Sequence, residues 1–353
     1  MSGIKILIVT HKPVKLLKGD IFCTVHAGRA IATKRTKDGK INKNDYKWLL
    51  ENTVGDDTGE NISAKNRYYS ECSVLYWAWK NYEKIDNPDH IGLMHYRRHF
   101  IFNEEYYQNK KKTKWEKALG YIKEPFITDK YTEKIGLKES VIKNIYKNYD
   151  LIVSKDSNLN LIHGRNLRED YKNTIPGVKV KDFDLMIEII KEKYPEYTEV
   201  IKKNINGYKK SMYQMFVMKR ELFFEYCNFL FDILFELEKR INFEKYTING
   251  KRSLGYLAEL ILTIYVWKKE EENKKILKLG VTMVEYPYQK EEINNILKRG
   301  CPKASEYFKY KILSFLAKGE LKISRKEIAH NIRRKRESFK KLKKYIKEGI
   351  ING

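Results

Sequence analysis

The residues best suited to chemistry in this chain lie together in the block 91–100. An apolar run of strand character is followed directly by His95-Tyr96-Arg97-Arg98-His99. Cationic side chains at the end of a buried strand are costly unless an anion or another polar group meets them. Because an Arg guanidinium matches the oxygens of a phosphate, the block predicts a site for a diphosphate, with Arg97, Arg98 and His95 as candidate ligands.

The geometry of this block depends on where the strand ends. If it stays extended, His95, Arg97 and His99 lie on one side, and Tyr96 and Arg98 lie on the other. Both arginines then reach one anion only if the strand ends or twists near position 97. Two alternatives stay open. The arginines could form an ion-pair cluster with nearby Asp or Glu, or His95 and His99 could bind a metal. The metal site is the weaker alternative, because no pair of carboxylates is adjacent to the two histidines.

Glu259 is a second candidate for chemistry, because it stands in the apolar helix predicted over Leu254–Trp267. A carboxylate in apolar surroundings tends to have a raised pKa or a cationic partner, and both suit a general base. Arg252 lies two turns earlier on the same face, so a buried Arg252–Glu259 ion pair is an equally good interpretation.

Two more segments predict contacts to a nucleotide. Thr10-His11-Lys12 follows the first strand and could meet a base or ribose at the carboxyl edge of the sheet, although an ordinary polar turn is as good an interpretation. Ser63 is the expected N-cap of a helix that begins in the segment 62–66, and a helix N-terminus offers free N–H groups to an anion. Neither a GxGxxG nor a Walker A pattern occurs in the chain.

The elements that must position these residues alternate between strand and helix. Apolar runs predict strands at Ile4–Val9, His90–Met94, Tyr149–Ser154, Tyr213–Lys219 and Gly280–Tyr286. Helical spacing predicts helices from Ser63 to about Tyr82 and over Pro176–Tyr194, Glu221–Glu238 and Leu254–Trp267, whereas residues 33–61 read as a long loop. This order indicates an α/β fold: a single Rossmann-type domain with a mostly parallel central sheet flanked by helices.

The charge of the chain suggests an anionic partner. It has 353 residues, 42% of them hydrophobic, and a net charge of +25. Residues 322–347 hold twelve Lys or Arg and two Glu, and the apolar residues of this tail (Ile328, Ile332, Phe339, Leu342 and Ile346, with Ile350 just beyond it) share one helix face. We expect this segment to bind an anionic membrane surface; nucleic-acid contact, and a helix that packs on the domain, are the alternatives.

The cysteines and the apolar runs of the chain indicate its cellular compartment. The four cysteines, Cys23, Cys72, Cys227 and Cys301, show no paired metal-ligand spacing and fit free thiols in a reducing compartment. The first ten residues lack the architecture of a cleavable signal, and no apolar run approaches the ~20 residues of a spanning helix. We therefore expect a cytoplasmic protein that is peripheral on the inner face of a bacterial membrane.

Taken together, these motifs resemble the DUF4422 family of bacterial glycosyltransferase-like proteins, which occur among the gene products for capsule, exopolysaccharide and lipopolysaccharide synthesis. The resemblance rests on Thr10-His11-Lys12, on Asn61-Ile62-Ser63 with Asn66, on residues 69–71 and on the Trp-rich segment 76–81. It also rests on Gly92–Phe100 with its HYRR core, on residues 215–219, on Tyr226-Cys227, and on Arg252 with Gly255-Tyr256-Leu257 and Glu259. The family looks like the GT-A group, which implies a GT-A-like domain at 1–300 and a basic helical extension at 301–353.

The resemblance also implies an activity and a set of roles. The expected function is inverting transfer of a sugar from a UDP-linked donor, such as UDP-galactofuranose or UDP-galactose, to a glycan or polyprenyl-linked acceptor in surface polysaccharide synthesis. Glu259 would be the general base and Arg97, Arg98 and His95 would stabilise the diphosphate. The donor would be held by Thr10, His11, Lys12, Ser63, Asn66, Tyr69 and Arg252.

Two departures from the family pattern matter. Gln214 stands where an Asn is expected, and the strand end that usually carries an Asp-x-Asp metal motif carries His95 to Arg98 instead. We therefore expect no metal ligands there and leave the use of a divalent metal open. The alternatives to a transferase are a nucleic-acid-binding protein that uses the basic tail, and a catalytically inactive binder of nucleotide sugars; we do not expect nucleic acid as a partner.

Overall fold

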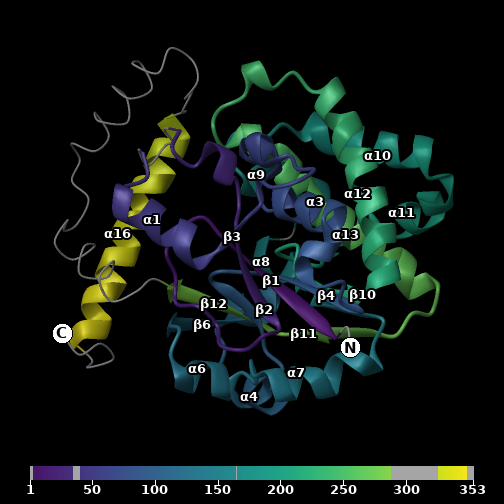
Figure 1. Cartoon of the computed structure of the whole chain (residues 1–353). Coiled ribbons are helices and arrows are strands. Elements are labelled where there is room, and N and C mark those ends of the chain that lie inside the picture. The colour runs from purple at the N-terminus through teal and green to yellow at the C-terminus, as the bar shows by residue number, and fades with distance from the viewer. Residues whose placement is uncertain (1–2, 35–39, 164, 288–324, 348–353) are drawn as a thin grey trace.

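The computed structural model describes residues 3–34, 40–163, 165–287 and 325–347, and these form a mixed α/β fold around a central sheet (Figure 1). The sheet has ten strands within the described residues, and its main path runs β11–β7–β10–β4–β1–β2–β3. Neighbours are mostly parallel, with β10 antiparallel between β4 and β7. The predicted α/β class with a mostly parallel sheet is therefore confirmed.

The strands of the sheet are short apolar runs. They are β1 (Ile4–Thr10), β2 (Phe22–His26), β3 (Val54–Gly55), β4 (His90–His95), β5 (Arg98–Phe100), β6 (Tyr121–Phe126), β7 (Leu151–Ser154), β10 (Phe216–Lys219), β11 (Ile276–Leu279) and β12 (Val281–Tyr286). β8 (Ser157–Asn158) and β9 (Lys209–Lys210) form a separate pair. β1 and β4 are buried along almost their whole length, as expected for strands covered on both faces.

Helices cover both faces of the sheet. They are α1 (Lys43–Asn52), α2 (Asn66–Tyr69), α3 (Cys72–Lys80), α4 (Glu104–Asn109), α5 (Lys114–Leu119), α6 (Asp129–Lys134), α7 (Glu139–Ile145), α8 (Asn160–His163), α9 (Leu167–Thr174), α10 (Val180–Lys193), α11 (Thr198–Asn204), α12 (Arg220–Arg240), α13 (Ser253–Glu271) and α16 (Arg325–Lys347). Helices α3 and α10–α13 lie on one face, and α4, α6 and α7 lie on the other (Figure 1).

The core is divided by the sheet into two clusters. Leu7 and Val9 of β1 join the cluster under α3, α12 and α13, whereas Ile6 and Ile8 join the cluster under α6 and α7. This alternation follows from the two-residue period of a strand. Each fully buried Leu or Ile contributes about 2 kcal/mol through the apolar surface it removes from water. The strand ends that carry the polar residues are thus held by packing on both sides.

Parallel pairing brings the candidate residues of different strands to one edge. Val9 of β1 lies beside His95 of β4, and Thr10 lies beside His26 of β2. The carboxyl ends of parallel strands meet at the same edge of a sheet, which is where open α/β sheets bind ligands. The segments Thr10-His11-Lys12 and His95–Arg98 therefore open onto the same side of the molecule.

The region 33–82 differs from its predicted structure. The predicted loop 33–61 contains α1, which Asn42 caps by accepting the N–H of Asp45 at 2.8 Å, and the short strand β3. The predicted helix from Ser63 is interrupted: a 3₁₀ turn at Ser63–Lys65 and α2 are separated from α3 by Ser70, whose φ is 51°. Helical periodicity continues across this break, so the sequence pattern alone does not reveal it.

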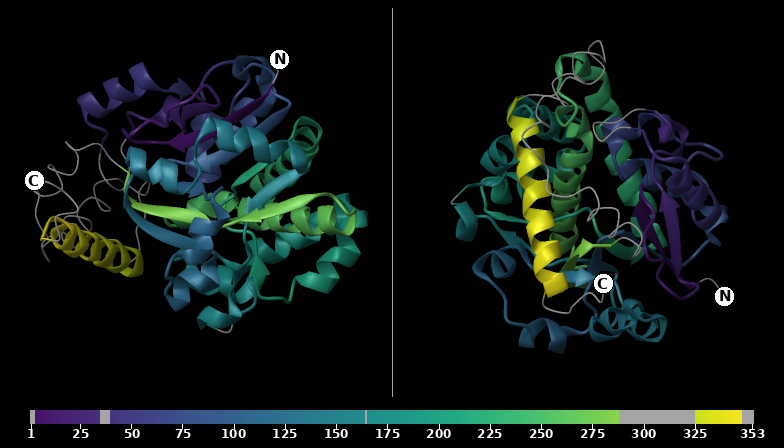
Figure 2. Two further views of the ribbon diagram at one scale, coloured as in Figure 1. Left: turned by 90° about the horizontal axis from the view of Figure 1, so that it is seen from below. Right: turned by 90° about the vertical axis from the view of Figure 1, so that its left-hand side faces the viewer.

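Helix α16 packs against the edge of the sheet at β12. Phe339 and Leu342 are buried, the Tyr286 hydroxyl donates to the carbonyl of Ser338, and the Tyr345 hydroxyl donates to Glu285 at 2.6 Å. Figure 2 shows α16 as a single rod along the outside of the domain. Its described apolar residues thus face protein, as in the packed-helix alternative. The predicted domain boundary at 300/301 lies outside the described residues.

Candidate active site

The diphosphate candidate is a tight hairpin between β4 and β5. Tyr96 and Arg97 form the turn, and His95 pairs with Arg98 across it. Directly opposed residues of an antiparallel pair project from the same face of the sheet. The expected split, with Arg98 on the side away from His95, is therefore wrong, because the chain reverses at position 97 instead of staying extended. The condition for both arginines to approach one anion, a strand end near position 97, is met.

The guanidinium groups of Arg97 and Arg98 have no carboxylate partner among the described residues, so the ion-pair alternative does not hold. Arg98 stacks on the ring of Tyr213, with its Cζ 4.6 Å from the ring centroid. Its Nε is buried and has no hydrogen-bond partner in the part of the chain described. Burial, and then the charge of Arg97, lower the pKa of Arg98. An unneutralised, partly desolvated guanidinium is what an incoming anion would stabilise.

His95 and His99 each bond to a different protein group, so they do not form a metal site together. His95 Nε2 lies 2.5 Å from the carbonyl oxygen of Tyr213 and therefore carries the proton of this bond. Burial and the nearby Arg98 lower the pKa of His95 to about 4, which leaves it neutral at pH 7. His99 Nδ1 lies 2.6 Å from the Tyr131 hydroxyl within the core. The geometry gives His95 the role of holding the Tyr213 backbone, and its predicted catalytic role stays a prediction.

Helix α13 presents its candidate residues on one face. Arg252 is the N-cap residue of α13, and Gly255 and Glu259 follow it at spacings of three and four residues, which aligns the three positions along the helix. Arg252 does not pair with Glu259: its Nε donates to the Ser70 hydroxyl at 3.1 Å, and the described residues contain no ion pair between the two. The alternative of a buried Arg252–Glu259 salt bridge is therefore not supported.

Glu259 lies at the junction of the hairpin, the 210–213 segment and the start of α3. The residue is partly exposed, and desolvation raises the pKa of its carboxyl. Lys210 opposes this rise most strongly, the charge of Glu71 adds to it, and Arg98 opposes it. A carboxylate with a raised pKa that remains open to solvent is suited to accept a proton.

Glu71 is a functional candidate that the sequence prediction did not include among the site residues. It is partly exposed, desolvation raises its pKa, and the charges of Arg252 and Arg98 oppose that rise. Its only sequence signal is its place beside Tyr69 in a segment that resembles the family pattern. Lys210 and Tyr213, which also reach the site, stand in a stretch without any motif.

The Thr10-His11-Lys12 segment lies at the rim of this cluster. Thr10 is fully buried, and its hydroxyl donates to the carbonyl of Lys12 at 2.7 Å, so it shapes the turn. His11 is exposed and meets the ring of Tyr96 edge-on at 5.2 Å between centroids. Desolvation and the charges of Lys12, Arg252 and Arg97 lower the pKa of His11.

Ser63 belongs to a buried network centred on Asp56. Ser63 donates to Asp56 at 2.5 Å and accepts the N–H of Ala30 at 3.1 Å. Asp56 also accepts the backbone N–H of Gly28 and the hydroxyl of Ser73. The expected N-cap at Ser63 is therefore wrong, because its hydroxyl serves a tertiary network, and a direct contact from Ser63 to a ligand does not fit its complete burial.

Tyr69 is also too deep to contact a donor. It is fully buried and its hydroxyl donates to Glu238 of α12 at 2.9 Å. Asn66, which is partly exposed, uses its amide to hold the carbonyl of Ser70 at 2.7 Å. These two predicted donor ligands thus support the turn that carries Glu71. A role for Asn66 at the ligand itself stays a prediction.

Gln214, the departure from the family pattern, stands in a strained backbone segment. Tyr213 and Gln214 have φ values of 74° and 49°, a left-handed conformation that Asn adopts more readily than Gln. The Gln214 side chain is fully buried and donates to the Tyr226 hydroxyl at 3.1 Å. Gln214 therefore anchors the segment from the core side, and the strain is concentrated beside Glu259 and Arg98.

Metal ligation does not fit the strand end. In the described ranges no three His, Cys, Asp or Glu side chains gather in a way that could hold a metal ion. The end of β4 offers guanidinium groups, which repel a cation, and a neutral His95 whose Nε2 is already bonded.

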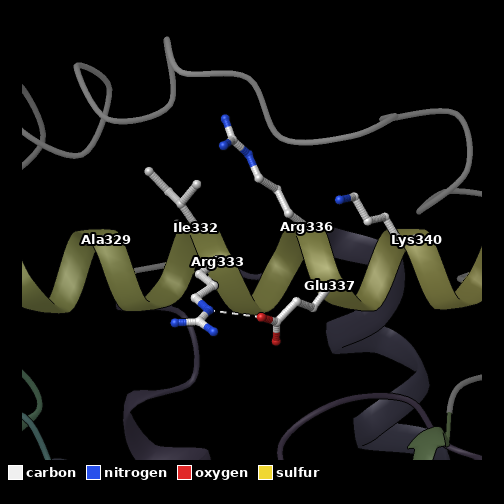
Figure 3. Close-up of a pocket in the computed structure, with 6 residues that line it drawn as sticks. All are labelled: Ala329, Ile332, Arg333, Arg336, Glu337 and Lys340. Atoms are coloured by element: carbon white, nitrogen blue, oxygen red, sulfur yellow. Dashed lines mark hydrogen bonds and ion pairs between the residues drawn. The ribbon is translucent and has the colours of Figure 1, made fainter.

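A shallow pocket of about 400 Å³ lies on α16 and is separate from this cluster. Ala329, Ile332, Arg333, Arg336, Glu337 and Lys340 line it, and Arg333 pairs with Glu337 (Figure 3). None of the predicted catalytic or donor-binding residues is among them.

The chain is similar in sequence and fold to known proteins. The profile of a family described as "Domain of unknown function (DUF4422)" matches residues 5–271. A search of curated proteins gives no match. Among solved structures, the apo form of the bifunctional glycosyltransferase WbbM is similar, with a TM-score of 0.69 and 30% sequence identity. The similarity covers 80% of this chain and 46% of WbbM, so the chain spans about half of that protein's length.

Proposed function

Because the chain belongs to the DUF4422 family, we propose that it is a glycosyltransferase that moves a sugar from a nucleotide-sugar donor to a glycan or lipid-linked acceptor. The similarity to WbbM over most of this chain supports the general activity. A UDP-linked donor, UDP-galactofuranose or UDP-galactose, and a place in surface polysaccharide synthesis are the finer parts of the proposal. The main support for the proposal lies at the carboxyl edge of the sheet. There, Arg97 and Arg98 have no carboxylate partner among the described residues, and the charge of Arg98 acts on Glu259, whose carboxyl has a raised pKa.

The proposed reaction is a direct, inverting displacement. The acceptor hydroxyl oxygen forms a bond to the anomeric carbon as the bond from that carbon to the diphosphate oxygen breaks. The electron pair leaves with the nucleoside diphosphate, and the hydroxyl proton passes to Glu259. The charge that develops on the leaving group is stabilised by Arg97 and Arg98, whose positions are set before the reaction.

The other predicted ligands fall into two groups in this proposal. His11, Lys12 and Arg252 lie close enough to act on one another electrostatically, and they contribute positive charge or polar contacts to the nucleotide. Thr10 holds the turn that carries His11 and Lys12, whereas Ser63 and Tyr69 have structural roles behind the site, since their hydroxyls already bond to Asp56 and Glu238. Neutral His95 orients Tyr213 and hence the ring on which Arg98 stacks.

We also propose that the chain contacts an anionic membrane surface through the outer face of α16. Exposed cations on this helix include Arg333, Arg334, Lys340, Lys343 and Lys347. The described apolar residues of α16 pack on the domain, so the contact would be electrostatic, at about 1 kcal/mol per cation, and would not bury the apolar face in lipid. The described residues contain no helix that is both long and apolar enough to cross a bilayer.

The membrane contact is tested by co-sedimentation with vesicles. Arg334→Gln, Lys340→Gln and Lys343→Gln together should release the protein from anionic vesicles but leave its melting temperature unchanged. The same number of changes at Lys47, Lys147 and Lys202 serves as the control. Equal binding by both triple variants would refute the assignment.

The transferase activity is tested with a panel of nucleotide sugars, measured for binding and for turnover. Glu259→Gln should lower turnover at least about 100-fold and leave donor affinity unchanged, because a general base contributes about 10²–10⁴ in rate. Glu271→Gln, an exposed residue on the same helix, is the matched control. Full activity of Glu259→Gln would overturn the assignment of the base.

The same panel separates the alternatives. Thermal stabilisation by UDP without turnover of any donor would indicate an inactive nucleotide-sugar binder. Stabilisation by single-stranded RNA but not by UDP would indicate a nucleic-acid-binding protein. Activity that persists in excess EDTA would support a mechanism in which arginines serve in place of a metal, and rescue by manganese would count against it.

A further inference from the structure

The Ser70 turn brings a second carboxylate, Glu71, to the face of α13 that carries Glu259. A Cβ placed on Gly255 would lie 2.8 Å from the Ser70 hydroxyl oxygen and 2.9 Å from its Cβ. The helix backbone therefore touches the turn directly, and only glycine permits this approach. Glu259 lies one helical turn beyond Gly255, and Glu71 is the next residue after Ser70, so the contact sets the two acids near each other.

The turn is strained and held from several sides. Ser70 has φ 51° and ψ −129°, a conformation rare for a residue with a side chain, and such strain costs about 1–3 kcal/mol. Arg252 donates to the Ser70 hydroxyl at 3.1 Å, and Asn66 donates to the Ser70 carbonyl at 2.7 Å. Strain that the surroundings hold in place at a candidate site indicates that the direction of Glu71 matters.

The charges around the pair are unequal. Arg98 acts on both carboxylates, Arg252 acts on Glu71, and Lys210 acts on Glu259. Lys210, the cation that opposes the pKa rise of Glu259 most strongly, is also paired with Asp170 at 2.8 Å. In the described residues no ion pair within 4.0 Å is formed by either acid. Arg98 is thus a cation that acts on both acids.

Resting on the function proposed above, we propose that Glu71 is a positioning residue for the transfer: its carboxylate competes with Glu259 for Arg98, so that Arg98 stays directed at the diphosphate and Glu259 stays available for the proton of the acceptor hydroxyl. If position 71 is neutral, Arg98 turns to Glu259. The base is then weakened and the diphosphate loses part of its countercharge. Both effects lower the rate, and the first also changes its pH dependence.

His95, Cys72 and Tyr213, which lie near Glu259, stay uncharged between pH 5 and 8. His95 is neutral because its pKa is lowered to about 4, and burial raises the pKa values of Cys72 and Tyr213. The groups that act on Glu259 from the elements packed round it are Lys210, Arg98, His95, Cys72, Tyr213 and Glu71. The fall in kcat/KM at low pH, its acid limb, therefore reports the protonation of the Glu71–Glu259 pair.

The test compares Glu71→Gln and Glu71→Asp with Glu83→Gln, an exposed residue beyond α3. Loss of a like charge, and transfer of Arg98 to Glu259, both lower the pKa of Glu259. The acid limb of kcat/KM in Glu71→Gln should move down by about one pH unit, with a lower plateau. Glu71→Asp and Glu83→Gln should keep the wild-type limb. An unmoved limb in Glu71→Gln, with activity lowered uniformly, would mean a structural role only and would overturn the proposal.

A second measurement is independent of turnover. Carboxyl ¹³C titration of Glu-labelled protein follows Glu259 directly, with its signal assigned by its absence in Glu259→Gln. The Glu259 titration should shift down in Glu71→Gln and not in Glu83→Gln; an unchanged titration overturns the proposal. If the titration shifts but no nucleotide sugar is turned over, the proposed function fails while the coupling of the two acids stands.

Discussion

Replacement of Arg98 by Met separates a ligand site from a structural ion pair, because the two predict opposite effects on stability. Arg98 has no carboxylate partner among the described residues, and its Nε is buried without a hydrogen bond. Its lowered pKa shows that the folded protein disfavours the charge. Met keeps the contact with the Tyr213 ring, since a thioether also packs well on an aromatic face. Loss of the charge should therefore leave the melting temperature equal or higher.

The affinity for UDP, unlike the melting temperature, should fall in Arg98→Met. A charge-assisted hydrogen bond to a phosphate contributes about 1.5–3 kcal/mol, and each 1.4 kcal/mol corresponds to a tenfold change in Kd. Arg98→Met should therefore weaken UDP binding by roughly 10- to 150-fold in a calorimetric titration. Arg168→Met, which breaks the exposed pair with Asp184, is the matched control and should change neither quantity much. If Arg98 were part of a buried ion pair, its removal would cost about 3–5 kcal/mol of stability. A melting temperature lowered by many degrees, with unchanged UDP binding, would therefore show that Arg98 has a structural role and is not a ligand of the diphosphate.

Three further predictions follow from the contacts around the site. Tyr69→Phe should lower stability by about 1 kcal/mol through loss of the bond to Glu238, with UDP affinity unchanged; a tenfold weaker affinity in the titration would show that Tyr69 reaches the donor. Asp56→Asn should cost about 3 kcal/mol in chemical denaturation, because the carboxylate accepts bonds from Gly28, Arg29, Ser63 and Ser73, while Asp57→Asn, exposed beside it, should cost little. Burial lowers the pKa of His99 to about 3, so the neutral form stabilises the fold fully above pH 6.5, and this stability is lost as the pH falls toward 3. His99→Gln should therefore flatten the dependence of the melting temperature on pH between 6.5 and 4. An unchanged slope in this variant would exclude His99 as the source of the pH dependence.

Much of the fold could be read from the sequence because buried strands and helices carry strong periodic signals. The runs at 4–9, 90–94 and 280–286 correspond to β1, β4 and β12 within one or two residues, and the long apolar helices correspond to α12 and α13. The short edge elements were missed. β3 has two residues and α1 is mostly polar, so neither shows a pattern that differs from a loop.

The candidate site was predictable only in part, for reasons that particular residues make clear. Arg97, Arg98 and Glu259 were found because charges in apolar surroundings stand out in a sequence. Ser63 and Tyr69 were placed at the ligand because they stand near the start of a helix, yet the structure buries both. Burial depends on what packs against a helix, and a local pattern does not contain this information.

The sequence by itself determined that a cationic cluster ends a buried strand, that a lone carboxylate stands in an apolar helix, and that the chain resembles one family. These are local properties, carried by residue type and by periods of two or 3.6 residues. Only the tertiary structure decided that the chain reverses at Arg97, that Arg252 bonds to Ser70 and not to Glu259, and that Glu71 joins the site. Each of these depends on contacts between residues that are far apart in the chain or on a single unusual φ angle, and neither leaves a periodic trace in the sequence.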